Sequence, residues 1–278
     1  MAKPTLTMRR LGRLLEKLRK DAGMTTEQVA STKAINRKSL RNLEEGTISV
    51  RWPTCKVLAE IYGAPSDVVQ RVVDMAMGAE TRGYREKSNA IGSPDFQMFF
   101  ELEPEASEIK VFDPEVITGL LQTKRYMTAV LKANPDVGPS QIPDAIAMRR
   151  QRQKNVFERD GDSPQITFVT TEGVMQRLVG GEDVRDEQLQ HLSTMVSDYG
   201  VDVRVILNSV GAYFPMNGPF TLLESRNDLD PPTVYLESYR ACEYIEEPEV
   251  VRSYRRVFAM LVASSIELKR YLNDVTLA

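Results

Sequence analysis

The chain has 278 residues, of which 42% are hydrophobic and 27% charged, a composition typical of a globular protein and a length that favours two domains. No run approaches the roughly 18 uninterrupted apolar residues of a membrane-spanning helix, and the N-terminal residues lack the apolar segment of a secretory signal. The two cysteines, Cys55 and Cys242, cannot build a disulfide framework or close a zinc site. We therefore expect a cytoplasmic protein with no membrane association, metal or cofactor.

The net charge of −3 conceals two regions of opposite sign. Residues 1–85 hold 16 Lys and Arg against 9 Asp and Glu, a net charge of +7, and the other 193 residues hold 20 against 30, a net charge of −10. A basic region joined to an acidic one is typical of a DNA-binding module attached to a partner domain. A solvated basic face without a ligand would give the same count, so the sequence motifs must decide.

The first helix is indicated by apolar residues at helical spacing, and it ends at Gly23, which suits a left-handed C-cap. Its apolar residues are Met8, Leu11, Leu14, Leu15 and Leu18. A second helix follows, for which Thr25 is the N-cap and Gln28 completes a capping box. After a short turn at residues 33–35, Asn36 caps a third helix that ends before Gly46.

The third helix, residues 37–44, has one apolar side and one polar side. Leu40 and Leu43 form the buried side. The outward residues are Arg37, Lys38, Ser39, Arg41 and Asn42. Arginine and lysine can pair with guanine O6 and N7, and asparagine with adenine N6 and N7, so this face suits the major groove of DNA.

Two further helices complete the first domain. A fourth contains Trp52, with Pro53 in its first turn, and a fifth runs from about Ser66 to Met77. Trp52 and Cys55 are expected in the core. The sequence thus predicts an all-α five-helix helix-turn-helix domain over residues 1–77 and a linker over 78–92, which lacks apolar periodicity.

The run from Met24 to Gly46 resembles the Cro/repressor-type (XRE) helix-turn-helix family. It departs from that family at Lys33, where an apolar residue is usual, and at Ala34, where glycine is usual, so Ala34 is expected to take the strained conformation of the turn. The resemblance implies that Thr26, at the start of the second helix, contacts a phosphate or base. It also implies that Arg37, Lys38, Arg41 and Asn42 read bases, while Arg10 and Arg51 flank the footprint and contact phosphates.

Residues 93–278 alternate strand-like and helix-like segments, which predicts an α+β domain with three or four strands. Its core begins with Phe96, Met98, Phe99, Phe100 and Leu102. Strand formers occupy residues 109–112, 166–170, 201–207, 220–224 and 234–237. Helices are expected over residues 116–131, 144–160, 174–178, 189–199 and 248–272.

This second region resembles the C-terminal domain of actinobacterial WhiJ-like regulators. The matching segments are Gly119–Thr123 with Tyr126, Arg149–Gln151, Gly173–Gly181, Gly218–Glu224 and Val234–Glu237. One departure is Thr118, where that group commonly has proline. The resemblance implies a regulator that works with a small partner protein encoded nearby, sometimes likened to a toxin–antitoxin pair.

The residues give little support to an enzyme. The chain lacks a Gly-x-Ser-x-Gly elbow, a phosphate loop and a dinucleotide fingerprint. Its one histidine, His191, falls on the polar side of a helix and is expected to be exposed. The acidic runs at residues 101–108 and 243–249 are interpreted as solvated faces, and the basic run Arg149–Lys154 as a charged helix surface rather than an anion site.

Two hypotheses of different classes remain open. The first is a transcriptional regulator that represses by binding an operator in double-stranded DNA as a homodimer, under the control of a ligand or small partner protein acting on its second domain. The second is an antitoxin-like protein that neutralises a small partner and uses DNA binding only to autoregulate its operon. They differ in what the second domain binds.

Overall fold

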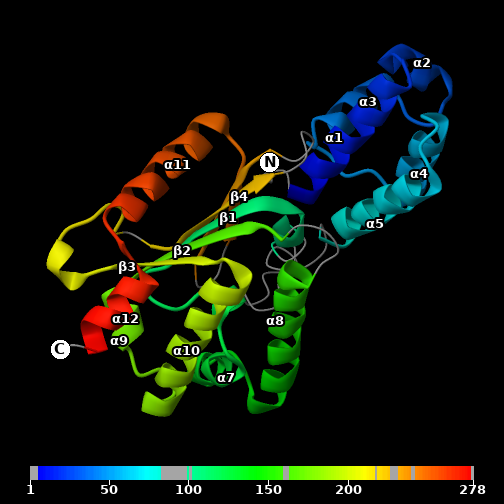
Figure 1. The fold of residues 1–278 in the computed structure, drawn as a ribbon. Helices are drawn as coiled ribbons and strands as arrows, with labels where there is room; N and C mark the ends of the chain where they lie inside the picture. Colours follow the sequence, from blue (N-terminus) through cyan, green and yellow to red (C-terminus); the bar gives the residue numbers. More distant parts are fainter. Residues whose placement is uncertain are drawn as a thin grey trace. The chain divides into compact units, whose positions relative to one another are not determined.

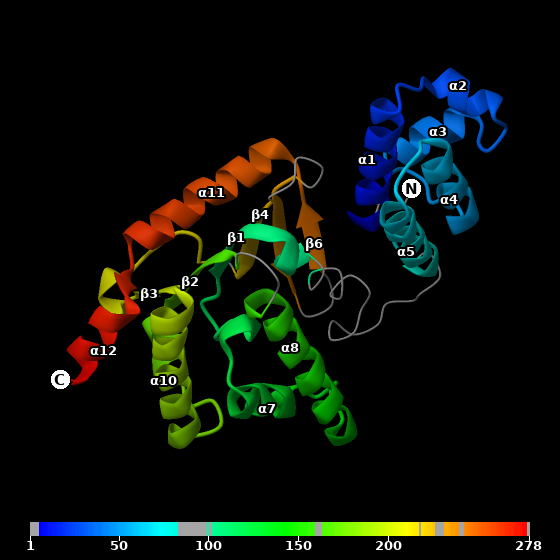
Figure 2. The same ribbon diagram turned by 45° about the vertical axis from the view of Figure 1, so that its right-hand side comes forward.

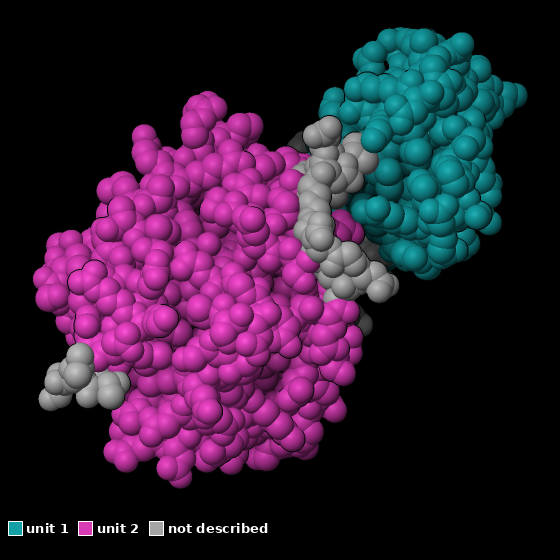
Figure 3. Space-filling view, viewed as in Figure 1, with its two compact units in different colours: residues 1–88, 227–230 teal, residues 89–226, 231–278 magenta. Residues whose placement is uncertain are grey.

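The computed structural model describes residues 6–82, 99, 102–158, 163–216, 218–225, 231–238 and 242–276. The chain divides into two compact units, one of residues 1–88 with 227–230 and one of residues 89–226 with 231–278, which Figure 3 draws in different colours. No helix among the described residues is both long enough and apolar enough to cross a membrane.

The described part of the first unit is entirely helical, as the sequence predicts (Figure 1). Its helices are α1 (Leu6–Asp21), α2 (Thr26–Ser31), α3 (Arg37–Glu44), α4 (Trp52–Ile61) and α5 (Ser66–Arg82). They enclose one apolar core, to which α1 contributes Leu11 and Leu15 and α3 contributes Leu40 and Leu43. Helix α5 continues past the expected end at Met77 into residues assigned to the linker, and residues 83–92 of that linker lie outside the described residues.

The second unit is built on one mixed sheet, which confirms the α+β class. The described strands are β1 (Ala106–Phe112), β2 (Gln165–Thr171), β3 (Asp202–Ile206), β4 (Phe220–Ser225), β5 (Thr233–Glu237), β6 (Cys242–Ile245) and β7 (Ile266–Glu267). Their order is β6-β5-β4-β1-β2-β3-β7, with β1, β2 and β3 parallel to one another and the other pairings antiparallel. The expectation of three or four strands was therefore too low. All five strand-forming segments of the sequence become strands, β1 to β5, and the short strands β6 and β7 lack a local sequence signal.

Helices cover both faces of this sheet (Figures 1 and 2). One face carries α11 (Pro248–Ala263), and Phe258 and Leu261 of α11 join a cluster with Phe112 and Phe220 of the sheet. The other face carries α7 (Lys124–Ala133), α8 (Ile142–Phe157) and α10 (Glu182–Tyr199). The described residues of this unit also form α9 (Glu172–Gln176) and α12 (Leu268–Thr276).

Two long helices expected from the sequence are interrupted. The segment 116–131 contains a short 3-10 turn, Gly119–Leu121, and then α7, whose N-cap Thr123 accepts a hydrogen bond from the Tyr126 N–H. The segment 248–272 breaks after Ala263, because Ile266 and Glu267 pair with β3 as strand β7 before α12 begins. Helix α8 ends at Phe157, whereas the expected end, Asp160, lies outside the described residues.

Candidate DNA-binding surface and a cavity in the second unit

Helices α2 and α3 begin where the capping residues predict. The Gln28 N–H donates to Thr25 Oγ1 at 3.2 Å and the Thr25 N–H donates to Gln28 Oε1 at 2.7 Å, which completes the capping box. The Ser39 N–H donates to Asn36 Oδ1 at 2.9 Å, so Asn36 caps α3. Side chains thereby satisfy backbone donors that each helix start leaves without an intrahelical partner.

The turn between α2 and α3 differs from the expectation at one residue. Lys33 has a φ of 63°, and it is the one residue other than glycine with positive φ in the described part of the chain. The strained position is therefore Lys33 and not Ala34. Thr32 supports the turn, because its hydroxyl donates to the Val29 carbonyl at 2.7 Å and accepts from the Ala34 N–H at 3.4 Å. The turn forms without glycine, and Lys33 adopts the left-handed conformation, which is unfavourable for a residue with a side chain.

Helix α3 presents its expected polar face to solvent. Leu40 and Leu43 are 0% and 1% exposed, whereas Arg37, Lys38 and Arg41 are exposed. With 100° between successive residues, these three side chains project from one side of the helix, opposite the leucines. Asn42 extends that side and is half-buried. Ser39 is also half-buried and lies next to the leucine side, at the margin of the polar face.

An ion pair links α2 to the polar face of α3. Arg37 Nη2 lies 2.6 Å from Glu27 Oε1, and both side chains are about half exposed to solvent. The pKa of Glu27 is lowered by its own backbone hydrogen bond at the start of α2, by the Thr26 hydroxyl and by the charges of Arg37 and Arg41. The Thr26 hydroxyl, which is predicted to contact a phosphate or base, donates to Glu27 Oε2 at 3.0 Å.

Helix α1 fixes the C-terminal end of α3. A Cβ atom at Gly12 would lie 2.6 Å from the Glu44 carbonyl oxygen, so only glycine permits this close crossing. Arg19 on α1 forms two hydrogen bonds with the Glu44 carboxylate, of 2.6 and 2.9 Å, and a third with the Met24 carbonyl at 2.9 Å. The Arg19 and Glu44 side chains are 10% and 7% exposed. This buried pair joins α1, the start of α2 and the end of α3.

The two arginines predicted to flank the footprint differ from each other. Arg51 is exposed at the N-cap of α4. Arg10 is only 7% exposed, so its side chain is less available than Arg51 for the phosphate contact that the sequence predicts. Two other residues differ from expectation. Trp52 is 36% exposed rather than in the core, and His191 is half-buried on α10, where burial lowers its pKa.

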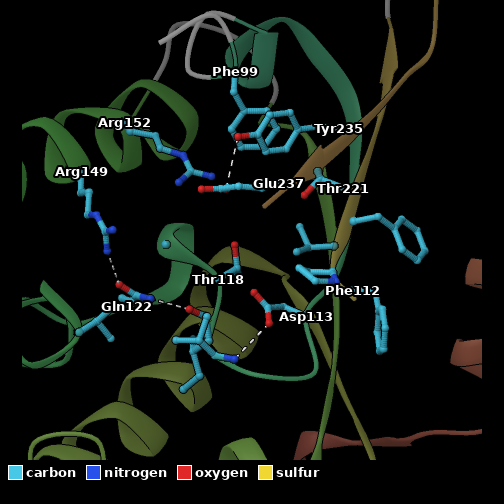
Figure 4. A pocket seen from close by; sticks show the side chains of 17 residues that line it. Phe99, Phe112, Asp113, Thr118, Gln122, Arg149, Arg152, Thr221, Tyr235 and Glu237 are labelled. Carbon is cyan, nitrogen blue, oxygen red and sulfur yellow. Dashed lines mark hydrogen bonds between the residues drawn. The ribbon is translucent and has the colours of Figure 1, made fainter. Parts of the chain in front are cut away.

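The second unit contains a cavity of about 250 Å³ beside the C-terminal end of β1 (Figure 4). This edge also holds the start of β4, since Phe112 pairs with Phe220, and the end of β5, since Thr221 pairs with Tyr235. At β1 the strand order reverses, because β2 and β3 follow on one side of it and β4, β5 and β6 are added on the other. Ligands bind in open α/β sheets at such switch points. The residues with polar side chains that line the cavity are Asp113, Thr118, Gln122, Arg149, Arg152, Thr221, Tyr235 and Glu237.

Arg152, which forms a buried pair with Glu103, is part of the cavity wall. The guanidinium makes two hydrogen bonds to the carboxylate, of 2.5 and 2.7 Å, and lies 5.0 Å from the centre of the Phe99 ring. A Cβ at Gly119 would approach Arg152 Nη1 to 2.8 Å, so glycine makes room for it. These contacts correct two interpretations. Glu103 is 0% exposed and not part of a solvated acidic face, and Arg152 is buried rather than on a charged helix surface.

Three glutamine side chains donate hydrogen bonds to backbone carbonyls of residues 117–122, beside the cavity. Gln153 Nε2 donates to the carbonyls of Gly119, Leu120 and Gln122 at 2.9 to 3.2 Å. Gln122 Nε2 donates to the Ile117 carbonyl at 2.6 Å, and Gln188 Nε2 to the Leu121 carbonyl at 2.7 Å. Side-chain amides thus replace the helical hydrogen bonds that residues 117–123 do not make.

Two charged groups in the cavity are poorly compensated. Arg149 donates one hydrogen bond, of 3.2 Å, to Gln122 Oε1 and forms no ion pair within the described residues. Burial lowers its pKa, and the neighbouring Arg152 lowers it further. Burial raises the pKa of Asp113 to about 6, against two backbone hydrogen bonds that lower it. Such groups are common at functional sites.

The sequence did not indicate this cavity. Asp113, Arg149 and Glu237 come from β1, α8 and the end of β5, and no local spacing relates them. The one signal was the basic run at 149–154, whose Arg149 lines the cavity and whose Arg152 is buried, but a run of cations on a helix predicts solvent exposure more often than burial.

Two family models match the chain. Residues 10–72 match a helix-turn-helix domain, and residues 96–270 match a family described as Domain of unknown function (DUF5753). No curated protein and no solved structure matches the chain. The first match indicates a DNA-binding regulator rather than an enzyme. Because the second match spans more than half of the 278 residues, the chain belongs to the DUF5753 family and carries a helix-turn-helix domain before that region.

Proposed function

We propose that this protein is a sequence-specific transcriptional repressor that binds its operator as a homodimer, and that a small ligand in the second unit controls the binding. The exposed side of α3 carries this proposal. It places Arg37, Lys38 and Arg41 together, opposite the buried Leu40 and Leu43. The start of the helix is capped by Asn36, and its end is held by Arg19 of α1. Such a helix can enter the major groove and present donors to base edges.

The contacts divide into two kinds under this proposal. Arg37, Lys38, Arg41 and Asn42 read bases, whereas Thr26 and Arg51 contact phosphates and set the register on the duplex. We assign Arg10 no contact in this interface, because its side chain is only 7% exposed. The net charge of +7 over residues 1–85 supplies the sequence-independent attraction to DNA.

The Glu27–Arg37 pair suggests how specificity is set. Glu27 holds the Arg37 guanidinium at 2.6 Å in the free protein, which limits the orientations that the arginine adopts before it meets a base. The carboxylate also repels phosphates, so binding away from the operator is weakened. We expect Glu27→Gln to raise affinity for random DNA and to reduce the ratio of specific to non-specific affinity.

Selection from a random duplex library tests the proposal directly. The intact chain is expected to enrich a two-fold symmetric sequence, because each copy of the helix-turn-helix covers one half-site. Its affinity for that sequence is expected to fall steeply between about 50 and 200 mM salt as counterions are released. Enrichment of no sequence, with salt-dependent binding retained, would reduce the protein to a non-specific DNA binder and would contradict the proposal.

A further inference from the structure

The charges that line the cavity of the second unit do not balance within the described residues. Glu103 neutralises Arg152 through two hydrogen bonds. This leaves one cation, Arg149, against two carboxyl groups, Asp113 and Glu237. Burial raises the pKa of Glu237, at the end of β5, but its carboxylate accepts a hydrogen bond from the Tyr235 hydroxyl at 3.3 Å, and the charges of Arg152 and Arg149 both act to lower its pKa. Asp113 is then the carboxyl group left without a cation.

The backbone uses only one of the Asp113 carboxyl oxygens. Oδ1 accepts hydrogen bonds from the N–H groups of Glu115 at 2.9 Å and Val116 at 3.1 Å. The described residues contribute no hydrogen bond to Oδ2 and no ion pair to the carboxylate. The nearby charges are those of Glu237 and Glu115, which are also negative. A carboxylate in this setting loses solvation and gains no opposite charge beyond these two hydrogen bonds, and a bound cation would supply that charge.

Thr118 adds a third oxygen to the same space. Figure 4 shows its hydroxyl and the carboxyl groups of Asp113 and Glu237 turned toward one cavity. Thr118 is 7% exposed and precedes the Gly119–Leu121 turn. Its hydroxyl can accept a hydrogen bond. Three acceptors from three segments match the three N–H donors of a primary ammonium group.

The remaining walls are apolar and set the size of the occupant. They include Phe112, Val116, Ile117, Val130 and Phe220. A space of about 250 Å³ lies just below the usual range for drug-sized ligands, so it suits a small molecule with a short apolar or aromatic body.

From this geometry we propose that the cavity binds a small primary amine, whose ammonium group pairs with Asp113 and donates to Thr118 and Glu237 while its apolar body packs on Phe112 and Phe220. The inference deepens the proposed function, because it names the class of ligand that the second unit senses. It gives Asp113 a role that the stability of the fold does not require.

Calorimetric titration of the intact chain with matched probes tests the proposal. The probes are 2-phenylethylamine and isoamylamine, each beside the alcohol and the carboxylate of the same carbon skeleton, and L-phenylalanine as a zwitterion. At least one amine is expected to bind at least tenfold more tightly than its alcohol and its carboxylate, because a charge-assisted hydrogen bond is worth more than a neutral one. Tighter binding of a carboxylate than of its amine would mean an anion site at Arg149, and equal binding of amine and alcohol would mean an apolar pocket. Either result would overturn the proposal. Tighter binding of L-phenylalanine than of 2-phenylethylamine would also overturn it.

Two variants locate the site, with one control. Asp113→Asn keeps an oxygen for the Glu115 and Val116 N–H groups but loses the charge, and it is expected to weaken amine binding at least tenfold. Thr118→Val keeps the shape and is expected to weaken it about tenfold. Asp186→Asn, which removes an exposed carboxylate on α10, is expected to leave amine binding unchanged. Unaltered binding in Asp113→Asn, with its folding verified by circular dichroism, would place the amine elsewhere and overturn the proposal.

These titrations contain no DNA, so their failure is distinguishable from failure of the proposed function. Loss of amine binding would leave operator recognition by α3 untouched. Amine binding that leaves operator affinity unchanged would preserve the site and remove ligand control from the proposed function.

Discussion

Lys33 occupies a strained position in the turn between α2 and α3 that glycine would occupy without strain. A left-handed conformation costs a residue with a side chain roughly 1–2 kcal/mol, and Lys33 adopts it with a φ of 63°. The neighbouring Ala34 has no positive φ. The sequence pattern assigned the strain to Ala34, so the two residues can be compared by mutation.

We expect Lys33→Gly to raise the free energy of unfolding of the first unit by about 0.5–1 kcal/mol, because glycine relieves the strain but loses more chain entropy on folding. Ala34→Gly is the control and is expected to lower it, since it adds chain entropy without relieving strain. Urea unfolding followed by fluorescence measures both, because the single tryptophan, Trp52, lies in this unit. Stabilisation by Ala34→Gly alone would show that the turn has the conformation expected from the sequence.

Asp113 makes the stability of the second unit depend on pH. Its pKa is raised from 3.8 to about 6 in the folded protein by burial, with Glu237 and Glu115 adding to the shift against two backbone hydrogen bonds. The folded state therefore holds this proton more tightly than the unfolded state. The stability gained from protonation is complete below about pH 4 and is lost as the pH rises through about 6.

The rise of the Asp113 pKa from 3.8 to about 6 means that ionisation of this group lowers the free energy of unfolding by up to roughly 3 kcal/mol between pH 4 and pH 7. Asp113→Asn cannot ionise, so we expect it to be more stable than the wild type at pH 7 and to have a flatter pH dependence. Chemical unfolding followed by far-ultraviolet circular dichroism at several pH values measures the difference. A variant less stable than the wild type at pH 7 would show that the carboxylate is stabilised by a partner.

At the scale of elements, the sequence predicted the helix ends that are fixed by residues nearby in the sequence. Thr25, Gln28 and Asn36 cap α2 and α3 as expected, because the capping atoms lie within three residues of their partners. The interruption before α7 was not predicted, since Gln153 and Gln188, distant in sequence, stabilise it. The cavity was missed for the same reason.

The Arg19–Glu44 pair is the element-scale contact on which the position of α3 depends most. Removing one partner of a buried pair leaves a charge without compensation and typically costs about 3–5 kcal/mol. We expect Glu44→Gln to destabilise the first unit by this amount, measured by urea unfolding with Trp52 fluorescence. The control is Glu16→Gln, whose pair with Lys20 is solvent-exposed, and its expected effect is below about 1 kcal/mol. Equal effects of the two variants would refute the role assigned to Glu44.

At the scale of the whole molecule, the two units carry different parts of the proposed function. The basic first region supplies the recognition helix, and the acidic second region supplies a cavity at the edge of a mixed sheet. The charge counts and the helix-turn-helix motif of the sequence together favoured a DNA-binding first region joined to an acidic second one. They gave no indication of what the second unit senses, because Asp113, Arg149 and Glu237 are brought together only by the fold of the sheet and α8.

The central claim is that the exposed side of α3 reads a DNA sequence. Its most direct test measures the affinity of the intact chain for two duplexes, the one that the wild type selects and a scrambled one. The variants compared are Arg37→Ala, Arg41→Ala and the control Arg256→Ala, which removes an exposed arginine of α11. The account predicts a loss of about 1–3 kcal/mol on the selected duplex for each α3 variant, a smaller loss on the scrambled one, and no change for the control. Unchanged affinity for the selected duplex in both α3 variants would contradict it.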